Sequence, residues 1–346
     1  MVHLFSFALS GILSYILTPL VLSAAKGWGF VDRPSPRRTG DLKPRLGGIA
    51  MYCAFVVTVL ATWPLVEGRT KEEAVKLAGV LAGSTIVALM GAWDDKRELG
   101  AIPQLIVQLL AASIAVASGI VIDRVNNPFG TTLHDSLIYF PPPLAMALTV
   151  VWIVGVINTI NFIDGIDGLA AGVTGVAAIV LASHSLQLGQ YTIAVLPLAL
   201  AGAAAGFLPH NFYPSKITMG TSGSVVLGYA IGTLSIIGGT KAATTLLVLA
   251  VPIIDAGWII VSRVVSGGSP FVGDRRHLHY RLLDLGLSQR QIVLIIYLLC
   301  AVLGSAALVL SSRLLKLYSL IGISTIIVGA LVLLARMAVK QRGRFR

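Results

Sequence analysis

The sequence has few charged residues and few cysteines, and each shortage excludes a class of protein. Only 12% of the 346 residues are Asp, Glu, Lys or Arg, and 56% are hydrophobic. A soluble domain carries about 25% charged residues, so the composition predicts a polytopic membrane protein. The two cysteines, Cys53 and Cys300, lie inside apolar runs. We expect them to be small buried hydrophobic residues that form neither a disulfide nor a metal site.

Eleven apolar stretches are long enough, or nearly so, to cross a bilayer as helices. They begin at about residues 4, 47, 75, 101, 143, 169, 191, 223, 242, 291 and 317. The first lacks the basic flank and cleavage site of a signal peptide, so it is counted as a spanning helix. No low-complexity linker divides the chain. The predicted fold is an all-α polytopic bundle of about eleven transmembrane helices, forming one domain over residues 1–346.

The basic residues are unevenly shared between the two sides of this bundle, with 19 on one side and seven on the other. The positive-inside rule then places the amino terminus outside and the carboxyl terminus in the cytoplasm. Topology therefore explains much of the net charge of +11, and no nucleic-acid partner is expected. The predicted cytoplasmic loops are residues 25–46, 93–100, 158–168, 209–222 and 264–290. The outer loops, including His134 and Asp135, are expected to be ordinary surface.

The most informative stretch runs from Asn158 to Gly168 between two apolar runs. Asn158, Asn161, Asp164 and Asp167 recur at every third position, a spacing that predicts one shared helical face. Carboxylates and carboxamides at a bilayer boundary can hold a hard cation, orient a phosphate or accept a proton. The alternative is an Asx-rich turn in which the glycines permit positive φ.

A second acidic motif, Asp94-Asp95, ends the third apolar stretch. Adjacent aspartates repel each other unless a cation or a proton lies between them, which suits a Mg²⁺ site beside a phosphate. The alternative is a solvated pair balanced by Lys96 and Arg97.

Three further polar segments fall on the predicted cytoplasmic side. Residues 32–48 form a basic, Pro- and Gly-rich loop that suits an anionic substrate, or simply a positive-inside loop. Residues 210–224 include a Gly/Ser/Thr-rich turn before a helix, which offers free N–H groups to an anion. Residues 274–281 place two histidines among three arginines, a composition that favours phosphate binding, although His-X-His also binds metals. Chemistry on one side indicates a cytoplasmic enzyme, because a transporter would carry charges in mid-span and the spans here are nearly free of charge.

The motifs occur in the order seen in one family. They are Lys43-Pro-Arg-Leu-Gly-Gly48, Asp94-Asp95, Asn158 to Gly168, Asn211-x-x-Pro-Ser-Lys216 with Met219-Gly220, and His277-Leu-His-Tyr-Arg281. From about residue 26 to 290 the chain resembles the polyprenyl-phosphate N-acetylhexosamine-1-phosphate transferases. Its last motif resembles the His-Leu-His-His-Arg of the branch that uses UDP-N-acetylglucosamine rather than the histidine run of the muramyl-pentapeptide branch.

The resemblance implies a Mg²⁺-dependent enzyme, with Mn²⁺ as an alternative ion, in the bacterial inner membrane. Undecaprenyl phosphate would attack the β-phosphorus of a UDP-N-acetylhexosamine and release UMP, starting a cell-envelope polysaccharide; relatives resemble dimers. The implied catalytic residues are Asp94, Asp95, Asp164, Asp167, His277 and His279. The implied substrate-binding residues are Lys43, Asn158, Asn211, Lys216, Arg276 and Arg281, and the implied metal ligands are Asn161, Asp94 and Asp95.

Two positions depart from the family pattern. Thr221 stands where the family usually has the aspartate of Met-Gly-Asp-Thr-Gly-Ser, which resembles a second metal ligand, and Tyr280 replaces a histidine. A hydroxyl is a poorer ligand for a hard cation than a carboxylate. Either Asp94, Asp95 or Asp164 takes over, or metal affinity falls, or activity is lost. The rival functions are a muramyl-pentapeptide translocase, a lipid or nucleotide-sugar transporter and an inactive relative.

Overall fold

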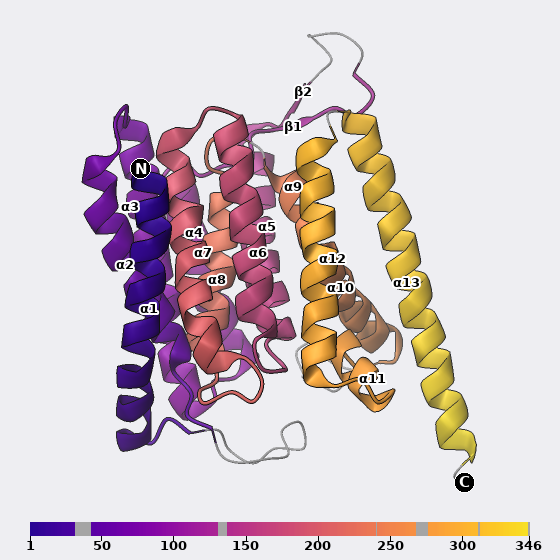
Figure 1. Ribbon diagram of the computed structural model, residues 1–346. Helices are drawn as coiled ribbons and strands as arrows, with labels where there is room; N and C mark the ends of the chain where they lie inside the picture. Colours follow the sequence, from indigo (N-terminus) through magenta and orange to yellow (C-terminus); the bar gives the residue numbers. More distant parts are fainter. Residues whose placement is uncertain (32–42, 131–136, 240, 268–275, 311, 345–346) are drawn as a thin grey trace.

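The computed structural model is a bundle of helices that run back and forth between two ends (Figure 1). It describes residues 1–31, 43–130, 137–239, 241–267, 276–310 and 312–344, so the predictions for residues 32–42, His134, Asp135, Asp274 and Arg275 fall outside it. The helices are α1 (Val2–Gly27), α2 (Gly47–Thr62), the 3-10 turn η1 (Trp63–Leu65), α3 (Lys71–Arg97), α4 (Ala101–Ala117), α5 (Pro142–Ile163), α6 (Leu169–Gln187), α7 (Tyr191–Asn211), α8 (Gly220–Leu234), α9 (Ala242–Val248), α10 (Ala250–Val265), α11 (Leu278–Asp284), α12 (Gln289–Val309) and α13 (Arg313–Arg344).

Every apolar stretch predicted from the sequence contains a helix, and the prediction of a polytopic membrane protein is confirmed. Within the described residues, eight helices are long and apolar enough to cross a membrane, and the pair α9–α10, bent by 79°, would make a ninth. The remaining two stretches form shorter helices, with 17 residues in α4 and 15 in α8. Figure 1 shows α1 beginning and α13 ending at opposite ends of the bundle. The exact number of crossings and the orientation stay predictions.

One segment differs from the all-helical prediction. Strands β1 (Arg124–Asn126) and β2 (Leu137–Tyr139) pair antiparallel, with Arg124 opposite Tyr139, in a segment predicted to be an ordinary surface loop. Three-residue strands are too short for an alternating pattern to be visible in the sequence. The cysteine prediction holds for bonding, because Cys53 and Cys300 are both free; Cys300 is buried and Cys53 half-buried.

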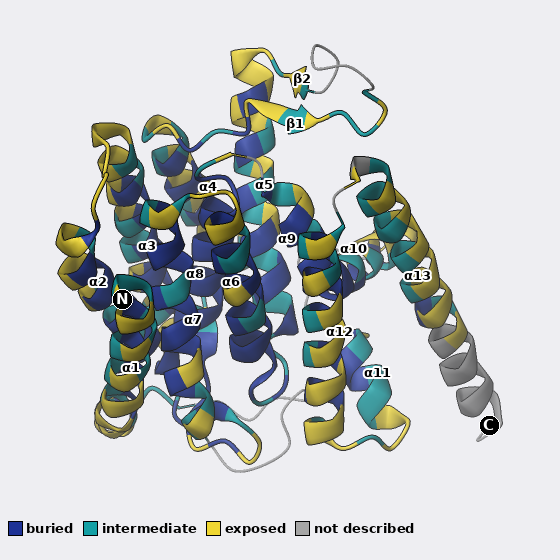
Figure 2. Cartoon of the chain, turned by 45° about the horizontal axis from the view of Figure 1, so that its top comes forward, coloured by how far each residue is buried: buried dark blue, intermediate teal, exposed yellow. Residues whose placement is uncertain are grey.

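Helix α8 lies at the centre of the bundle, against α2, α3 and α5. All of its residues are buried except Thr221, which is half-buried (Figure 2). Glycines allow this close approach. A Cβ on Gly48 would lie 2.0 Å from the nitrogen of Gly223, and one on Gly91 would lie 2.5 Å from the Cα of Ser222. Main-chain contact therefore fixes the amino terminus of α8 beside the end of α3.

Candidate active site

The carboxylate of Asp95 caps the amino terminus of α8. The first turn of a helix has backbone N–H groups without intrahelical partners, and the N-cap Met219 provides no side-chain acceptor. Asp95 takes this role from the last turn of α3: Oδ1 accepts from the Thr221 nitrogen at 2.8 Å and Oδ2 from the Ser222 nitrogen at 3.1 Å. The helix dipole favours a negative charge at this position. We call Asp94, Asp95, Thr221 and Ser222 the carboxylate cluster.

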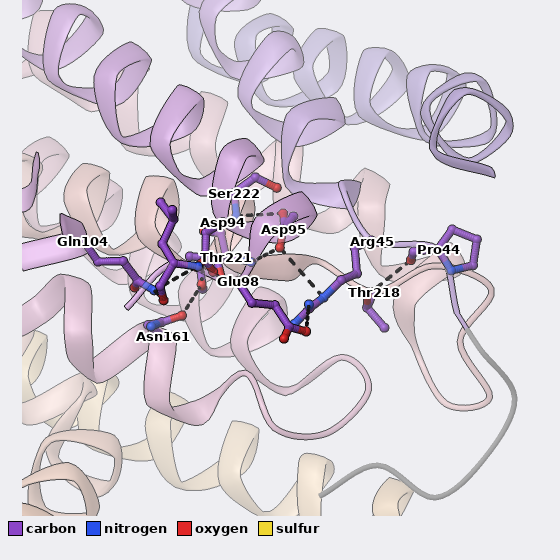
Figure 3. A network of polar contacts seen from close by, with 12 residues as sticks. Pro44, Arg45, Asp94, Asp95, Glu98, Gln104, Asn161, Thr218, Thr221 and Ser222 are labelled. Atoms are coloured by element: carbon purple, nitrogen blue, oxygen red, sulfur yellow. Dashed lines mark hydrogen bonds and ion pairs between the residues drawn. The ribbon is translucent and has the colours of Figure 1, made fainter. Parts of the chain in front are cut away.

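Asp94 is held by donors from three directions (Figure 3). Its Oδ1 accepts from the Leu99 nitrogen at 2.7 Å and from Gln104 Nε2 at 3.0 Å, and its Oδ2 accepts from the Thr221 hydroxyl at 2.5 Å. Neither Gln104 nor the role of Thr221 as a donor was predicted. A glutamine near the start of an apolar helix gives little signal in the sequence, although its burial beside a carboxylate needs a partner.

The segment before α2 is attached to the segment before α8. The Pro44 carbonyl accepts from the Thr218 nitrogen at 2.9 Å, and the nitrogen of Gly48 donates to the Met219 carbonyl at 2.9 Å. This pairing brings Arg45 towards the carboxylate cluster, with Nε 3.9 Å from Asp95 Oδ1 (Figure 3). Arg45 stood inside a quoted motif but was not predicted as a site residue. It supplies positive charge where the two aspartates lie together.

The predicted common face of Asn158, Asn161, Asp164 and Asp167 is wrong. Helix α5 ends at Ile163, and Gly168, with φ of +83°, begins α6 in the left-handed region, so the two aspartates lie in a glycine-containing turn. The alternative of an Asx-rich turn describes this part of the segment better. The three-residue spacing continues beyond Ile163, where the helix ends, and there it no longer indicates a shared helical face.

The side chains of this segment point to different partners. Asn158 Nδ2 donates to Gln108 Oε1 of α4 at 2.7 Å, whereas Asn161 Oδ1 accepts from the Ser224 hydroxyl of α8 at 2.7 Å. Asp167 Oδ2 accepts from Lys43 Nζ at 2.7 Å, and Asp164 is half-buried in the turn. Asn161 therefore joins the neighbourhood of the carboxylate cluster through α8, whereas Asn158 is directed towards α4.

Three polar contacts link Asp167, Lys43 and Ser215 at this end of the bundle. Besides the ion pair between Lys43 and Asp167, Lys43 Nζ donates to the Ser215 hydroxyl at 2.8 Å, and the Ser215 nitrogen donates to Asp167 at 3.0 Å. Asn211 is buried, and both ends of its amide bind backbone: Oδ1 accepts from the Gly168 nitrogen and Nδ2 donates to the Ile217 carbonyl. Lys216 is exposed beside them. Asn211 therefore links the turn that carries Asp167 to the segment before α8.

The histidine cluster consists of Asp255, His277 and His279. His277 and His279 stack with ring centroids 5.5 Å apart and an interplanar angle of 7°. The carboxylate of Asp255, on α10, lies 2.9 Å from His277 Nδ1. Burial, and to a lesser degree the electrostatic effect of His277, lowers the pKa of His279 to about 3, so this imidazole is neutral near pH 7. Asp255 was missed, because the spans were interpreted as nearly free of charge.

The two predicted arginines of this segment lie on its outer side. Arg276 is exposed, and Arg281 donates from Nε to the Arg276 carbonyl at 2.8 Å and from Nη1 to the Leu331 carbonyl of α13 at 3.0 Å. Tyr280 Oη donates to the Gly165 carbonyl at 3.2 Å, which attaches α11 to the turn after α5. In this arrangement Arg281 holds α11 against α13.

The oxygen donors near Thr221 fit a hard divalent cation. Asp94 Oδ2 bonds the Thr221 hydroxyl, and the Ser224 hydroxyl bridges the Thr221 carbonyl at 3.3 Å and Asn161 Oδ1 at 2.7 Å. In the described part of the chain no three Asp, Glu, His or Cys residues gather as a metal cluster. Mg²⁺ commonly binds through one or two carboxylates together with waters and substrate phosphates, so one carboxylate and one carboxamide suit it.

The chain is similar in sequence to a known family and to several named proteins. The model of glycosyl transferase family 4 matches residues 77–239. The chain is 34% identical to the probable undecaprenyl-phosphate N-acetylglucosaminyl 1-phosphate transferase of Bacillus subtilis, over 89% of this chain and 84% of that protein. It is 34% identical to the decaprenyl-phosphate N-acetylglucosaminephosphotransferase of Mycolicibacterium smegmatis, over 86% of this chain and 79% of that protein.

A third relative represents another activity. The chain is 30% identical to the phospho-N-acetylmuramoyl-pentapeptide-transferase of Geobacillus kaustophilus, over 86% of this chain and 95% of that protein. The bundle of apolar helices and the names of these relatives together define the class, a polytopic membrane transferase. The chain belongs to glycosyl transferase family 4, the polyprenyl-phosphate N-acetylhexosamine-1-phosphate transferases.

Proposed function

We propose that this protein transfers N-acetylglucosamine 1-phosphate from UDP-N-acetylglucosamine to undecaprenyl phosphate, forming a lipid-linked sugar diphosphate and releasing UMP. The observation that carries the proposal is the meeting of polar side chains from separate segments at one end of an apolar bundle. Such a site suits a reaction between a lipid in the membrane and a nucleotide sugar in water. The name of the Bacillus relative supports transfer of N-acetylglucosamine 1-phosphate to undecaprenyl phosphate, and that of the Mycolicibacterium relative supports the same sugar with decaprenyl phosphate.

The chemistry is an exchange of phosphorus–oxygen bonds. An oxygen of the lipid phosphate bonds to the β-phosphorus of the UDP-sugar, and the bond from that phosphorus to UMP breaks, with UMP leaving with the electron pair. The attacking phosphate is already an anion, so the protein must mainly position the groups and neutralise charge. In this proposal Lys43 and Arg45 offset the negative charge of the diphosphate, and His277, with both ring nitrogens protonated, donates a hydrogen bond to it through Nε2.

The proposed metal is Mg²⁺, with Mn²⁺ as an alternative. Asp94 Oδ2 and Asn161 Oδ1 would hold it; the Thr221 hydroxyl bonds the first of these oxygens and the Ser224 hydroxyl bonds the second. When bound, the ion would neutralise and polarise the diphosphate. Asp95 keeps α8 in place through the two backbone N–H groups of Thr221 and Ser222. We infer that Asp94, rather than Asp95, is the carboxylate that meets the ion, because both Asp95 oxygens accept main-chain bonds.

The cellular setting is part of the same proposal. The excess of basic residues on one side favours a cytoplasmic site, an external amino terminus and the bacterial inner membrane. The product would start a cell-envelope polysaccharide, and the protein is proposed to work as a homodimer.

The first experiment measures UMP released by the protein purified in detergent with undecaprenyl phosphate and UDP-N-acetylglucosamine. We expect UMP and lipid-linked product in equal amounts, no UMP without the lipid, and dependence on added Mg²⁺. UDP-N-acetylmuramoyl-pentapeptide is the rival donor, and faster turnover with it would assign the protein to the pentapeptide branch. No UMP from any UDP-acetamido sugar would contradict transferase activity.

The variant Thr221→Asp tests the metal position separately from activity. A second carboxylate beside Asp94 repels it unless a cation lies between them. We expect Thr221→Asp to unfold at a lower temperature than wild type in EDTA and to gain more thermal stability from Mg²⁺ than wild type does. Thr221→Asn, which has the same shape without the charge, is the matched control. Equal Mg²⁺ responses in Thr221→Asp and Thr221→Asn would exclude this place as the metal site.

A further inference from the structure

The buried carboxylate of Asp255 makes two hydrogen bonds that converge on the start of α11. Its Oδ2 is 2.9 Å from His277 Nδ1, and its Oδ1 accepts from the Leu278 nitrogen at 2.9 Å. Asp255 is 3% exposed and His277 is 6% exposed. A carboxylate is an acceptor on both oxygens, so we assign the proton of this hydrogen bond to the imidazole nitrogen that faces Asp255. Asp255 therefore determines which ring nitrogen of His277 points away from α10.

The surroundings of His277 explain why a fixed ring orientation matters. Its ring lies 5.8 Å from the ring of Phe162, the neighbour of Asn161, and stacks on His279. Within the described chain, no hydrogen bond engages the opposite nitrogen, Nε2. A ring with one nitrogen bound to a buried carboxylate and the other available is oriented towards a ligand, as in carboxylate–histidine pairs that direct an imidazole.

The helix that carries His279 cannot supply this orientation by itself. Helix α11 has seven residues, and its N-cap, His277, makes no side-chain cap hydrogen bond. Isolated helices shorter than about 12 residues are marginal in water. Asp255 comes from α10, beyond the 79° break that separates α10 from α9. The bend of the broken helix thus brings a carboxylate to the start of α11, whereas the contacts of Tyr280 and Arg281 hold the helix farther along.

We propose that Asp255 is a positioning residue of the site, which fixes His277 with Nδ1–H towards α10 and Nε2 towards the diphosphate of the sugar donor. The assignment of the diphosphate rests on the proposed function, whereas the orientation of the ring does not. Asp255 itself touches no reacting atom in this proposal. It acts through His277, and its loss is expected to lower the catalytic rate more than the affinity for the donor.

The first test reads the tautomer of His277 directly and needs no activity. In protein labelled with ¹⁵N-histidine, the NMR signal of His277 is assigned by its disappearance in His277→Gln. We expect Nδ1 of wild-type His277 to carry a proton, and the proton to move mainly to Nε2 in Asp255→Ala. A wild-type ring with Nδ1 unprotonated and Nε2 protonated would overturn the proposal, whether or not the protein releases UMP.

The second test is a double-mutant cycle on UMP release. Asp255→Asn should lower kcat by about 10- to 100-fold, as loss of an outer hydrogen-bond partner of a functional histidine typically does, and change the KM for UDP-N-acetylglucosamine by no more than about twofold. Adding Asp255→Asn to His277→Gln should cause little further loss, because residues that act as a unit are not additive. Losses that multiply would show that Asp255 does not act through His277.

A matched control separates positioning from simple anchoring of α11. Leu283 packs against the hydrophobic core from the same helix, and the described contacts of the Asp255–His277 pair do not include it. Leu283→Ala should lower thermal stability and leave kcat within about threefold of wild type, since core truncations act mainly on folding. If Leu283→Ala and Asp255→Asn lowered kcat equally at equal stability, Asp255 would be an anchor only. If wild type released no UMP while His277 had the expected tautomer, the proposed function would be wrong. The orientation of the His277 ring by Asp255 would still be supported.

Discussion

The carboxylate cluster and the histidine cluster lie at the same end of the molecule but are held in different ways. Asp95 binds two backbone N–H groups of α8, a helix that is buried at every residue except Thr221. His277 is held by one side chain at the start of a seven-residue helix. The first cluster is fixed by the main chain of the packed bundle. The second depends on a side-chain pair, so its geometry is easier to change by substitution.

The largest effect is expected at Asp94. Asp94→Asn removes the carboxylate charge that neighbours the proposed metal, and loss of one such electrostatic group typically lowers kcat by about 10²- to 10³-fold. UMP release measures the loss. Asp123→Asn, the same change at a carboxylate with 61% of its side chain exposed beside the β-hairpin, is the control and should behave as wild type. Similar rates for both variants would remove Asp94 from the chemistry.

A smaller effect, on stability, tests the main-chain contact that fixes the carboxylate cluster. A Cβ at position 91 would lie 2.5 Å from the Cα of Ser222, so Gly91→Ala must push α3 away from α8. Overpacking of this kind costs about 1–3 kcal/mol of the free energy of unfolding. At Gly155 no atom lies within 4 Å of an added Cβ, so Gly155→Ala in α5 is the matched control. Denaturant titration in detergent compares the two, and equal stabilities would contradict the close contact.

The smallest effect concerns His279. Its pKa is lowered from 6.5 to about 3, mainly by burial, so the unfolded chain binds this proton at higher pH than the folded chain does. Folding stability should therefore fall as pH drops from about 6.5 towards 3, and this part of the dependence is lost in His279→Gln. Melting temperatures between pH 7 and pH 5 give the comparison. An equally steep fall in wild type and His279→Gln would show that His279 does not contribute.

The sequence predicted the helices well because lipid imposes a simple rule. A segment that crosses a bilayer must be apolar over about 20 residues and must satisfy its own backbone hydrogen bonds, and both demands leave a pattern in composition. That these polar segments, far apart in the sequence, lie on the same side of the membrane was predictable only from the order of the predicted spans. The partners themselves were not: Lys43 lies 124 residues from Asp167, and spacing does not show which loops touch.

The site residues that the sequence did not predict share a physical feature. Gln104, Gln108 and Asp255 are single polar side chains inside apolar helices, and each acquires its role from a partner on another element. A lone ionisable group in such a run is a signal, because burial without a partner is expensive. Asp255 carried that signal. The end of α5 at Ile163 was not predicted for another reason: the three-residue spacing continues past Ile163 into the turn that leads to Gly168, the N-cap of α6.

The position of Asp95 affects the choice of an inactive variant for trapping substrates. Its carboxylate bears charge at the site and also closes the first turn of α8, so Asp95→Asn would alter the architecture together with the electrostatics. The Asp95→Asn variant would therefore give misleading evidence about how the sugar donor and the lipid phosphate bind before the reaction. His277→Gln leaves the main-chain bonds of α8 untouched, and it is the better background in which to capture the two substrates side by side.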